Sequence, residues 1–318
     1  MNWSTPVVLS PGFPPFKYEG STVVLGSCFA THLGQKLAYY KFRSLTNPFG
    51  VIFHPAPLAT LVERSVAMDY FREDELFQSQ SLWRNFQAHS SLAQPEKQTA
   101  LALLNERLVQ LRDYLEKANH LILTLGSAFL YRHKSSGQGV ANCHAVAATA
   151  FEKGLSNPQE IEECLIKLLD TIRQINPGIR VVLTVSPVRH IRDGLIENQR
   201  SKAHLLTAAH RLVDAQKAFY FPSYELLLDE LRDYRFYERD LLHPSAVAVD
   251  YIWERFKENW IDPSMYPTMK EVDAIQKGLQ HRPLHPDSEA HANFLRQMEA
   301  RMDRLLREFP FMQFNLPR

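Results

Sequence analysis

The chain has 318 residues, of which 45% are hydrophobic, 11% aromatic and 22% charged, as in an ordinary folded protein rather than a disordered, collagenous or coiled-coil one. The 36 Lys and Arg residues nearly balance the 35 Asp and Glu residues, so the net charge of +1 gives no overall electrostatic signal for duplex nucleic acid or an acidic membrane and leaves only a local basic patch as the alternative. Three scattered cysteines exclude a disulfide framework, no apolar run of about 18 residues occurs, and we expect no secretory signal because residues 1–11 lack a basic stretch followed by a long apolar one. We therefore expect a cytoplasmic protein with no nucleic-acid or membrane partner.

Three short apolar runs lack the polar alternation of half-buried strands. They cover residues 22–25, 121–125 and 179–185. Runs of this kind are typical of strands that are buried on both faces of a parallel sheet.

Amphipathic segments of helical length lie between these runs. In residues 95–118, leucines recur every three or four positions and form one apolar stripe. After Asn157-Pro158, a cap followed by proline at the first helical position, the same spacing continues to residue 175. Further helices are predicted at residues 29–40, 194–218 and 246–260.

The alternation of strand and helix predicts an α/β sandwich built of right-handed crossover units. Residues 71–91 interrupt it, either as a β-hairpin or as an irregular excursion. We expect one α/β domain over residues 1–262, with its core at about 20–260. Residues 263–318 are predicted to be a helical extension that packs on this core.

A Gly-Ser pair follows two of the predicted strands, as Gly26-Ser27 and as Gly126-Ser127. In an open α/β sheet, ligands bind outside the carboxyl ends of the strands, and small residues there let backbone N–H groups approach a substrate. This edge of the sheet is therefore the candidate site.

A histidine that could act as a base lies in the string Asp240-Leu241-Leu242-His243, shortly before a predicted helix. In a tight loop, this spacing brings the carboxylate of Asp240 to the Nδ1 side of the imidazole. That contact would fix the tautomer and stabilise the imidazolium formed during proton transfer. The alternative is that Asp240 and His243 only shape the entry to the helix.

A serine becomes a nucleophile only when a base takes its proton. Ser27 lies where a strand ends and a helix begins, so N–H groups at the helix start would face a developing oxyanion. Ser127 has the same local pattern, and Cys28 is a third candidate because a helix N-terminus lowers the pKa of a thiol. The structural alternatives are an N-cap for Ser27 and a small buried side chain for Cys28.

The string Gly26-Ser27-Cys28-Phe29-Ala30 resembles the signature that gives the GSCFA family its name, a family similar to the SGNH/GDSL hydrolase superfamily. Further strings follow in the order that such a protein would show. They are Asn47-Pro48-Phe49-Gly50, Thr124-Leu125-Gly126-Ser127, Val140-Ala141-Asn142-Cys143-His144, Ser186-Pro187-Val188 and Asp240-Leu241-Leu242-His243-Pro244. The resemblance implies a flavodoxin-like, three-layer α/β/α sandwich with a parallel sheet of about five strands. It also implies that Ser27 is the nucleophile, His243 the general base and then acid, and Asp240 the carboxylate that orients His243.

For the oxyanion, the resemblance implies the N–H of the nucleophile, a glycine and an asparagine. Gly50 matches the glycine. The superfamily's Gly-x-Asn-Asp is replaced here by the string that begins at Gly126, so Asn142 is the nearest candidate, although its carboxamide could equally cap a turn. Cys28 and Gly126 complete the residues expected to border the substrate.

Other polar clusters have simpler interpretations. Arg189, His190 and Arg192 follow the third predicted strand and either bind an anionic substrate group or form a solvated loop. Cys143 and His144 are adjacent, and no second ligand pair is suitably spaced, so we expect no metal and no other cofactor.

The sequence thus predicts a serine esterase that hydrolyses a small acyl ester or a carbohydrate O-acyl ester through Ser27, His243 and Asp240. An acyltransferase with the same site is one alternative. A non-catalytic protein that binds a glycan or another small ligand on the same scaffold is a second. Catalysis by Cys28 is a third.

Overall fold

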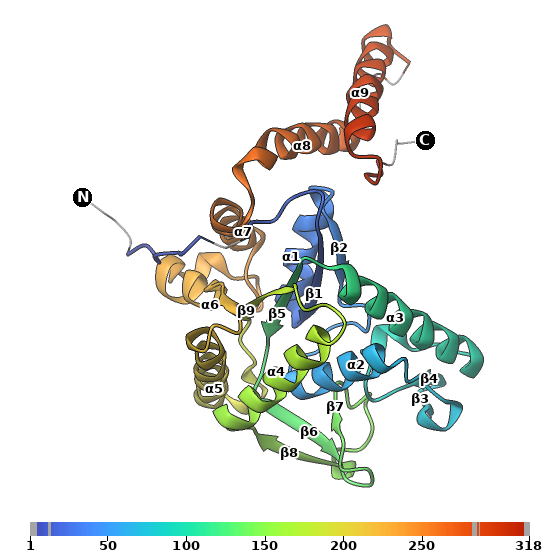
Figure 1. Cartoon of the computed structure of the whole chain (residues 1–318), viewed down its shortest axis with the longest axis vertical. Coiled ribbons are helices and arrows are strands. Elements are labelled where there is room, and N and C mark those ends of the chain that lie inside the picture. The colour runs from blue at the N-terminus through green and yellow to red at the C-terminus, as the bar shows by residue number, and fades with distance from the viewer. Residues whose placement is uncertain (1–4, 12–13, 282–284, 286, 315–318) are drawn as a thin grey trace.

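The centre of the molecule is a five-stranded parallel sheet in the order β10-β9-β5-β1-β2 (Figure 1). The computed structural model describes residues 5–11, 14–281, 285 and 287–314. The strands of this sheet are β1 (Ser21–Gly26), β2 (Arg43–Thr46), β5 (His120–Leu125), β9 (Arg180–Val185) and β10 (Phe219–Tyr220). β1, the first strand of this sheet in the chain, lies between β2 and β5, which are its second and third strands. This is the flavodoxin-like order. The predicted parallel sheet of about five strands is confirmed.

The three predicted apolar strands are the central ones, and their side chains alternate between two hydrophobic clusters. In β1, Val23 and Leu25 join one cluster and Val24 joins the other. Both faces of the sheet are therefore covered, which explains why these runs show no polar alternation.

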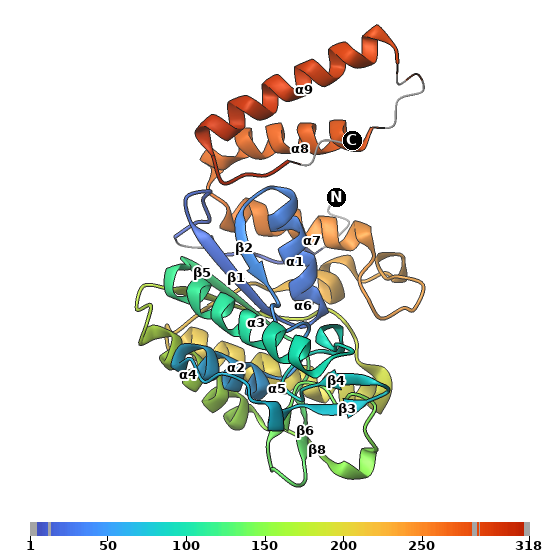
Figure 2. The same cartoon turned by 90° about the vertical axis from the view of Figure 1, so that its right-hand side faces the viewer.

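Helices cover both faces and complete three layers (Figure 2). One face packs against α2 (Pro55–Ala67), α3 (Lys97–Lys117), α4 (Pro158–Arg173) and α5 (Leu195–Asp214). The other packs against α1 (Cys28–Tyr39), α7 (Ala246–Trp260) and the π-helical turn over Leu226–Leu231 that follows the short α6 (Ser223–Glu225).

The predicted helices are present with ends that differ by a few residues. Asn157 caps α4 as expected: its Oδ1 accepts from the Glu160 amide at 3.0 Å, and the Glu160 side chain accepts from the Asn157 amide. α2 was not predicted, because Pro55 and Pro57 obscure its amphipathic pattern. Both prolines lie in the first turn, where no intrahelical N–H bond is lost.

The segment over residues 71–91 contains both of the alternatives left open by the sequence. It forms a short antiparallel hairpin of β3 (Phe77–Ser79) and β4 (Leu82–Arg84), flanked by irregular backbone.

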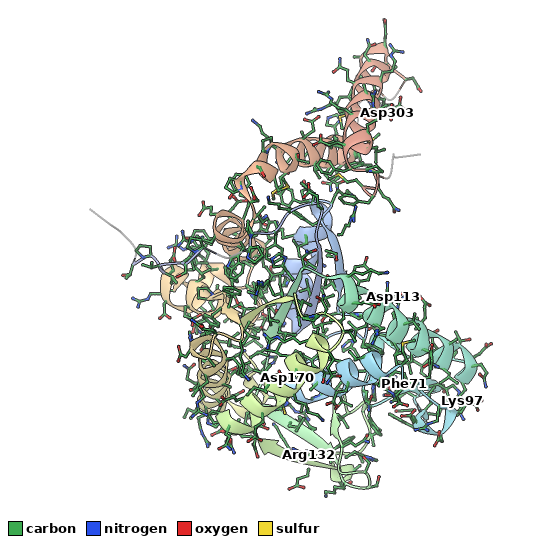
Figure 3. The ribbon with its side chains drawn as sticks, viewed as in Figure 1. Phe71, Lys97, Asp113, Arg132, Asp170 and Asp303 are labelled. Carbon is green, nitrogen blue, oxygen red and sulfur yellow. The ribbon has the colours of Figure 1, made fainter. Side chains whose placement is uncertain are left out.

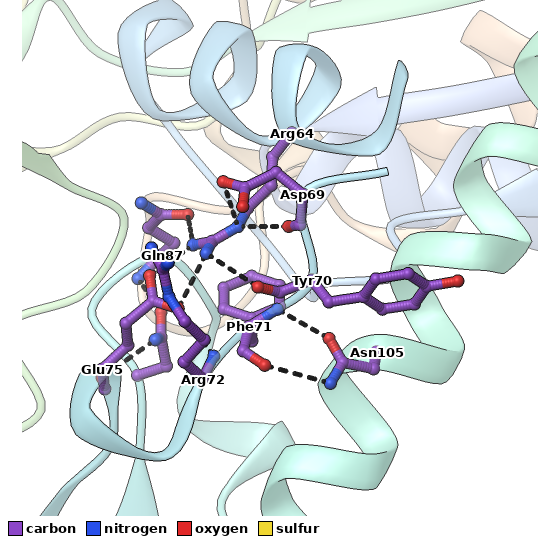
Figure 4. Close-up of polar contacts among 9 residues, drawn as sticks. Arg64, Asp69, Tyr70, Phe71, Arg72, Glu75, Gln87 and Asn105 are labelled. Carbon is purple, nitrogen blue, oxygen red and sulfur yellow. Dashed lines mark hydrogen bonds and ion pairs between the residues drawn. The ribbon is translucent and has the colours of Figure 1, made fainter. Parts of the chain in front are cut away.

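The chain leading into this hairpin is held by the buried guanidinium of Arg64, which extends from α2 (Figure 4). Arg64 pairs with both carboxylate oxygens of Glu75 at 2.7 Å and donates to the carbonyl oxygen of Asp69 at 2.7 Å. The same group lies over the ring of Phe71, 4.0 Å from its centroid.

A second, antiparallel sheet was not predicted. It consists of β6 (Phe129–His133), β7 (Gly139–Val140) and β8 (Phe151–Leu155) in the order β7-β6-β8. Its strands are short and carry charged residues such as Arg132 and Lys153, so they lack a clear strand pattern.

Two C-terminal helices, α8 (Tyr266–Gln280) and α9 (Glu289–Glu308), lie at the opposite end of the molecule from β6 and β8 (Figures 1 and 2). Met298 and Met302 of α9 pack into the same cluster as Val272 of α8, and Arg301 pairs with Glu271 at 2.7 and 2.8 Å. The predicted C-terminal helices are therefore present, while the domain boundary at residue 262 stays a prediction.

Exposed carboxylates such as Asp113, Asp170 and Asp303 point to the outside of the molecule (Figure 3). No helix in the described ranges combines the length and the apolar character that a membrane span requires.

Candidate active site

Ser27 lies in a turn between β1 and α1 whose backbone admits only glycine at the preceding position. Gly26 has a φ of +129°, and a Cβ added there would lie 2.1 Å from the carbonyl oxygen of Thr124. The Gly26 amide donates to Oδ1 of Asn47 at 2.8 Å, and the Ser27 amide donates to the Thr124 carbonyl oxygen at 3.0 Å. These contacts fix the end of β1 against β5 and β2.

The hydroxyl of Ser27 has no structural partner. The residue is 0% exposed, and its Oγ makes no hydrogen bond to any of the described residues. Ser27 occupies the N-cap position of α1, yet its side chain accepts no bond from the first turn of the helix. Capping, the structural alternative for this serine, is therefore not what the hydroxyl does.

Asp240 and His243 form a hydrogen-bonded pair in the loop before α7. Oδ2 of Asp240 lies 2.6 Å from Nδ1 of His243, and Oδ1 accepts from the amides of Leu242 and His243 at 2.9 and 3.0 Å. The two amides and the imidazole lower the pKa of Asp240 to about 2. This carboxylate is therefore ionised at neutral pH and holds the imidazole by Nδ1, which leaves Nε2 as the atom that can exchange a proton with a substrate or a nucleophile.

This pair faces the helix that begins at Ser27. His243, Asp240 and Glu238 line a groove of about 500 Å³ together with His32 and Lys36 of α1. The pKa of His32 is lowered by burial and, secondarily, by the proximity of His243. The structure thus brings Asp240 and His243 together beside α1, but Ser27 does not line the groove and no Ser27–His243 hydrogen bond is formed.

The two other nucleophile candidates have local explanations. Oγ of Ser127 accepts from the Phe129 amide at 3.1 Å and lies 3.4 Å from Oγ of Ser201, so this serine closes a turn and contacts α5. Burial raises the pKa of the Cys28 thiol, and the opposing effect of Lys202 is smaller. Cys28 is therefore a thiol, not a thiolate, at neutral pH.

The residues predicted for the oxyanion are already engaged within the protein. The Gly50 amide donates to the Asn47 carbonyl oxygen at 2.8 Å, and the Gly126 amide donates to the Phe53 carbonyl oxygen at 2.9 Å. Oδ1 of Asn142 accepts from the His144 amide at 2.7 Å, which is the turn-capping alternative. In the first turn of α1 the Ala30 amide already donates to the Ser27 carbonyl oxygen at 2.9 Å, whereas the amides of Cys28 and Phe29 precede the first hydrogen bond of the helix.

Gly126 has a different, steric importance. A Cβ at this position would lie 3.0 Å from Cβ of Ser27 and 2.9 Å from Cδ1 of Phe53. Glycine therefore allows the turn after β5 to pack directly against the turn that carries Ser27.

One polar face of α5 supports the ends of β5 and β9, and the sequence analysis missed it. Its buried residues Ser201 and Lys202 lie three and four positions after the buried Asn198 and so share a helix face with it. Oγ of Ser201 accepts from the Ala128 amide at 2.7 Å, and Oδ1 of Asn198 accepts from the His190 amide at 2.8 Å.

Lys202 is the most unusual member of this face. It is 0% exposed, and its Nζ donates to the carbonyl oxygens of Gly126 and Ser186, both at 2.7 Å. No ion pair of the described residues includes it, and burial lowers its pKa to about 7. Lys202 thus connects the turns after β5 and β9 without a carboxylate partner.

A metal site is not apparent in the described ranges: they contain no group of three or more His, Cys, Asp or Glu side chains able to hold an ion. This edge of the sheet presents a hydroxyl, an Asp-His pair and hydrogen-bond donors.

The fold and this edge define a parallel α/β protein with a buried serine after the first strand and an Asp-His pair in the last loop. A family model described as "GSCFA family" matches residues 21–256, and one described as "GSCFA domain protein, C-terminal domain" matches residues 272–316. The chain belongs to the GSCFA family. A search of curated proteins finds no match.

Proposed function

We propose that this protein is a serine esterase in which Ser27 attacks the carbonyl carbon of an ester. The observation that carries the proposal is the hydroxyl of Ser27, which is buried at the carboxyl end of β1 and makes no hydrogen bond within the described part of the chain. Buried polar atoms nearly always have a partner, and those that lack one are concentrated at functional sites. No structural hydrogen bond among the described residues therefore accounts for this hydroxyl.

The Asp240–His243 pair supplies the base. When Oγ of Ser27 bonds to the carbonyl carbon, its proton passes to Nε2 of His243 and the carbonyl π electrons move to the oxygen. Ionised Asp240 stabilises the imidazolium that results. Collapse of the intermediate breaks the ester C–O bond, and the leaving alkoxide takes the proton from His243.

A water molecule then attacks the acyl group on Ser27, again with His243 as base, and releases the acid. In an acyltransferase, the hydroxyl of an acceptor would take the place of this water. For proton transfer, Ser27 and His243 must approach each other more closely than they do here, as is common when a hydrolase binds its substrate.

The groove beside His243 supports an alcohol portion rich in hydroxyl groups, as in a carbohydrate O-acyl ester. Its lining includes His32, Gln35, Lys36, Glu238 and Asp250, which offer both donors and acceptors.

The three cysteines are free, in keeping with the reducing, cytoplasmic compartment expected from the sequence.

A second candidate function is non-catalytic binding of a glycan or small ligand in the same groove. It is favoured by the complete burial of Ser27 and by the absence of a Ser27–His243 hydrogen bond among the described residues. Such a protein would bind a ligand saturably and would not turn it over.

Hydrolysis of short-chain p-nitrophenyl esters tests the proposal, with Ser27→Ala compared with Ser127→Ala. The wild type and Ser127→Ala should hydrolyse these esters, and Ser27→Ala should not. Full activity in Ser27→Ala would reject Ser27 as the nucleophile, and activity in that variant that is sensitive to alkylation would indicate Cys28.

A further inference from the structure

His190, which the sequence placed in a loop that could bind an anionic substrate group, also carries a buried polar atom without a partner among the described residues, and packing connects it to Ser27. Nε2 of His190 is buried and makes no hydrogen bond to the described residues. Resting on the proposed esterase function, we propose that the Nε2–H of His190 donates a hydrogen bond to the oxyanion formed at Ser27. It would take the place of the asparagine that this chain lacks after β5.

Packing connects His190 to Ser27 through two residues. The His190 ring meets the ring of Phe53 edge-on, with centroids 4.9 Å apart. Phe53 packs on Gly126, and Gly126 is also the residue that touches Ser27. Oγ of Ser27 and Nε2 of His190, two of the seven buried atoms without a partner among the described residues, therefore belong to one packed cluster at the carboxyl edge of the sheet.

The surroundings of His190 keep its imidazole neutral. Burial, the ammonium group of Lys202 and the nearby His243 lower the pKa of His190 to about 4, in that order of importance. An imidazole with a pKa of about 4 is a weak base at neutral pH, but its N–H still donates. A donor fixed at the position where charge develops stabilises the transition state without reorganising during the reaction.

The backbone around His190 is held on both sides. Its amide donates to Asn198 of α5, and the preceding Arg189 amide donates to the Leu242 carbonyl oxygen at 3.2 Å. Lys202 fixes the start of the same loop through the carbonyl oxygen of Ser186. The loop that carries His190 is thus attached to the loop of the Asp-His pair and to the turn beside Ser27, as a preorganised donor requires.

The rate of phosphonylation of Ser27 by an alkyl fluorophosphonate measures this donor directly. In that reaction the bond from Oγ to phosphorus forms, the P–F bond breaks, fluoride leaves with the electron pair and the serine proton passes to His243. The phosphonyl oxygen occupies the oxyanion position. His190 neither gains nor loses a proton.

We expect His190→Leu to lower the second-order rate constant by about 100- to 1000-fold, the usual effect of removing one oxyanion donor. His190→Gln places a carboxamide N–H near the position of Nε2 and should stay within about tenfold of the wild type. His210→Leu, which changes an exposed histidine of α5, should leave the rate unchanged. Circular dichroism checks that each variant is folded.

Equal rates for His190→Leu and the wild type would overturn the role of His190 while leaving the esterase proposal intact. Equally slow labelling of the Leu and Gln variants would also overturn it, because packing and not an N–H would then be the property that matters. If the wild type carries no label on Ser27, the esterase proposal and this inference both fail.

Discussion

Oδ2 of Asp240 lies 2.6 Å from Nδ1 of His243, and the other oxygen of the same carboxylate accepts from two backbone amides of the loop. The carboxylate therefore orients the imidazole and also shapes the loop that presents it to α1. This double role makes the Asp-His loop sensitive to pH.

Acid should weaken this loop over a defined window. The pKa of Asp240 is about 2 in the folded chain against an ordinary value of 3.8, so the unfolded chain binds more protons between these values. The stabilisation is present above about pH 4 and is lost as the pH falls through about 2. The difference in melting temperature between the wild type and Asp240→Asn should therefore shrink from about pH 5 to about pH 2.5.

Asp113→Asn is the matched control for this experiment, because Asp113 is exposed and makes no hydrogen bond or ion pair with the described residues. It should differ little from the wild type at every pH. A constant difference between the wild type and Asp240→Asn across the window would contradict the account.

The two serines that follow strands should differ in stability as well as in activity. Ser27→Ala removes a buried hydroxyl without a partner, so the free energy of unfolding should stay the same or rise by up to about 1 kcal/mol. Ser127→Ala deprives the Phe129 amide of its acceptor and should lower the free energy of unfolding by about 1 to 2 kcal/mol. Urea denaturation of both variants gives these values, and a larger loss for Ser27→Ala would show that its hydroxyl has a structural partner after all.

Gly26→Ala should be among the most damaging single changes in the chain. Its Cβ would lie 2.1 Å from a backbone oxygen at a φ of +129°, so we expect a loss of roughly 4 kcal/mol or more, or failure to fold. Gly137→Ala is the control, because Gly137 also has a positive φ of +68° but has open space around it, and it should cost about 1 kcal/mol. Similar thermal stability of the two variants would mean that the Ser27 turn is less constrained than the structure indicates.

The buried guanidinium of Arg64 should contribute far more to the stability of the fold than the exposed guanidinium of Arg72. Arg64→Met leaves Glu75 and two loop carbonyls without their donor and should lower the free energy of unfolding by roughly 3 kcal/mol. Arg72→Met removes a side chain that is 70% exposed and 4.0 Å from Glu75, and should cost less than about 0.5 kcal/mol. Denaturation curves compare the two, and equal losses would argue against this role of Arg64.

Much of the fold could be predicted because its signals are local. The strands that end at Gly26 and Leu125 are continuous apolar runs, and the cap at Asn157 marks a helix start by itself. The Asp240–His243 contact joins residues three apart, so their spacing was enough to suggest it.

The rest of the site depends on contacts between distant segments. No sequence pattern separates Ser27 from Ser127, because one of the two contacts of the Ser127 hydroxyl is with Ser201, on a helix 74 residues further along the chain. The buried face of α5 carries the polar residues Asn198, Ser201 and Lys202. Amphipathic patterns assign polar residues of a helix to its solvent face, so they do not predict the burial of these three. Their three- and four-residue spacing was a usable signal, but its meaning depends on which strand ends the helix covers.

The measurement that tests the central claim most directly is the site of the covalent adduct after reaction of the full chain with a fluorophosphonate, located by peptide mass spectrometry. The account predicts one adduct, on the peptide that contains Ser27, which is absent in Ser27→Ala and forms slowly in His243→Ala. An adduct on Ser127 or Cys28, or no adduct in a chain that binds a glycan ester saturably, would contradict it.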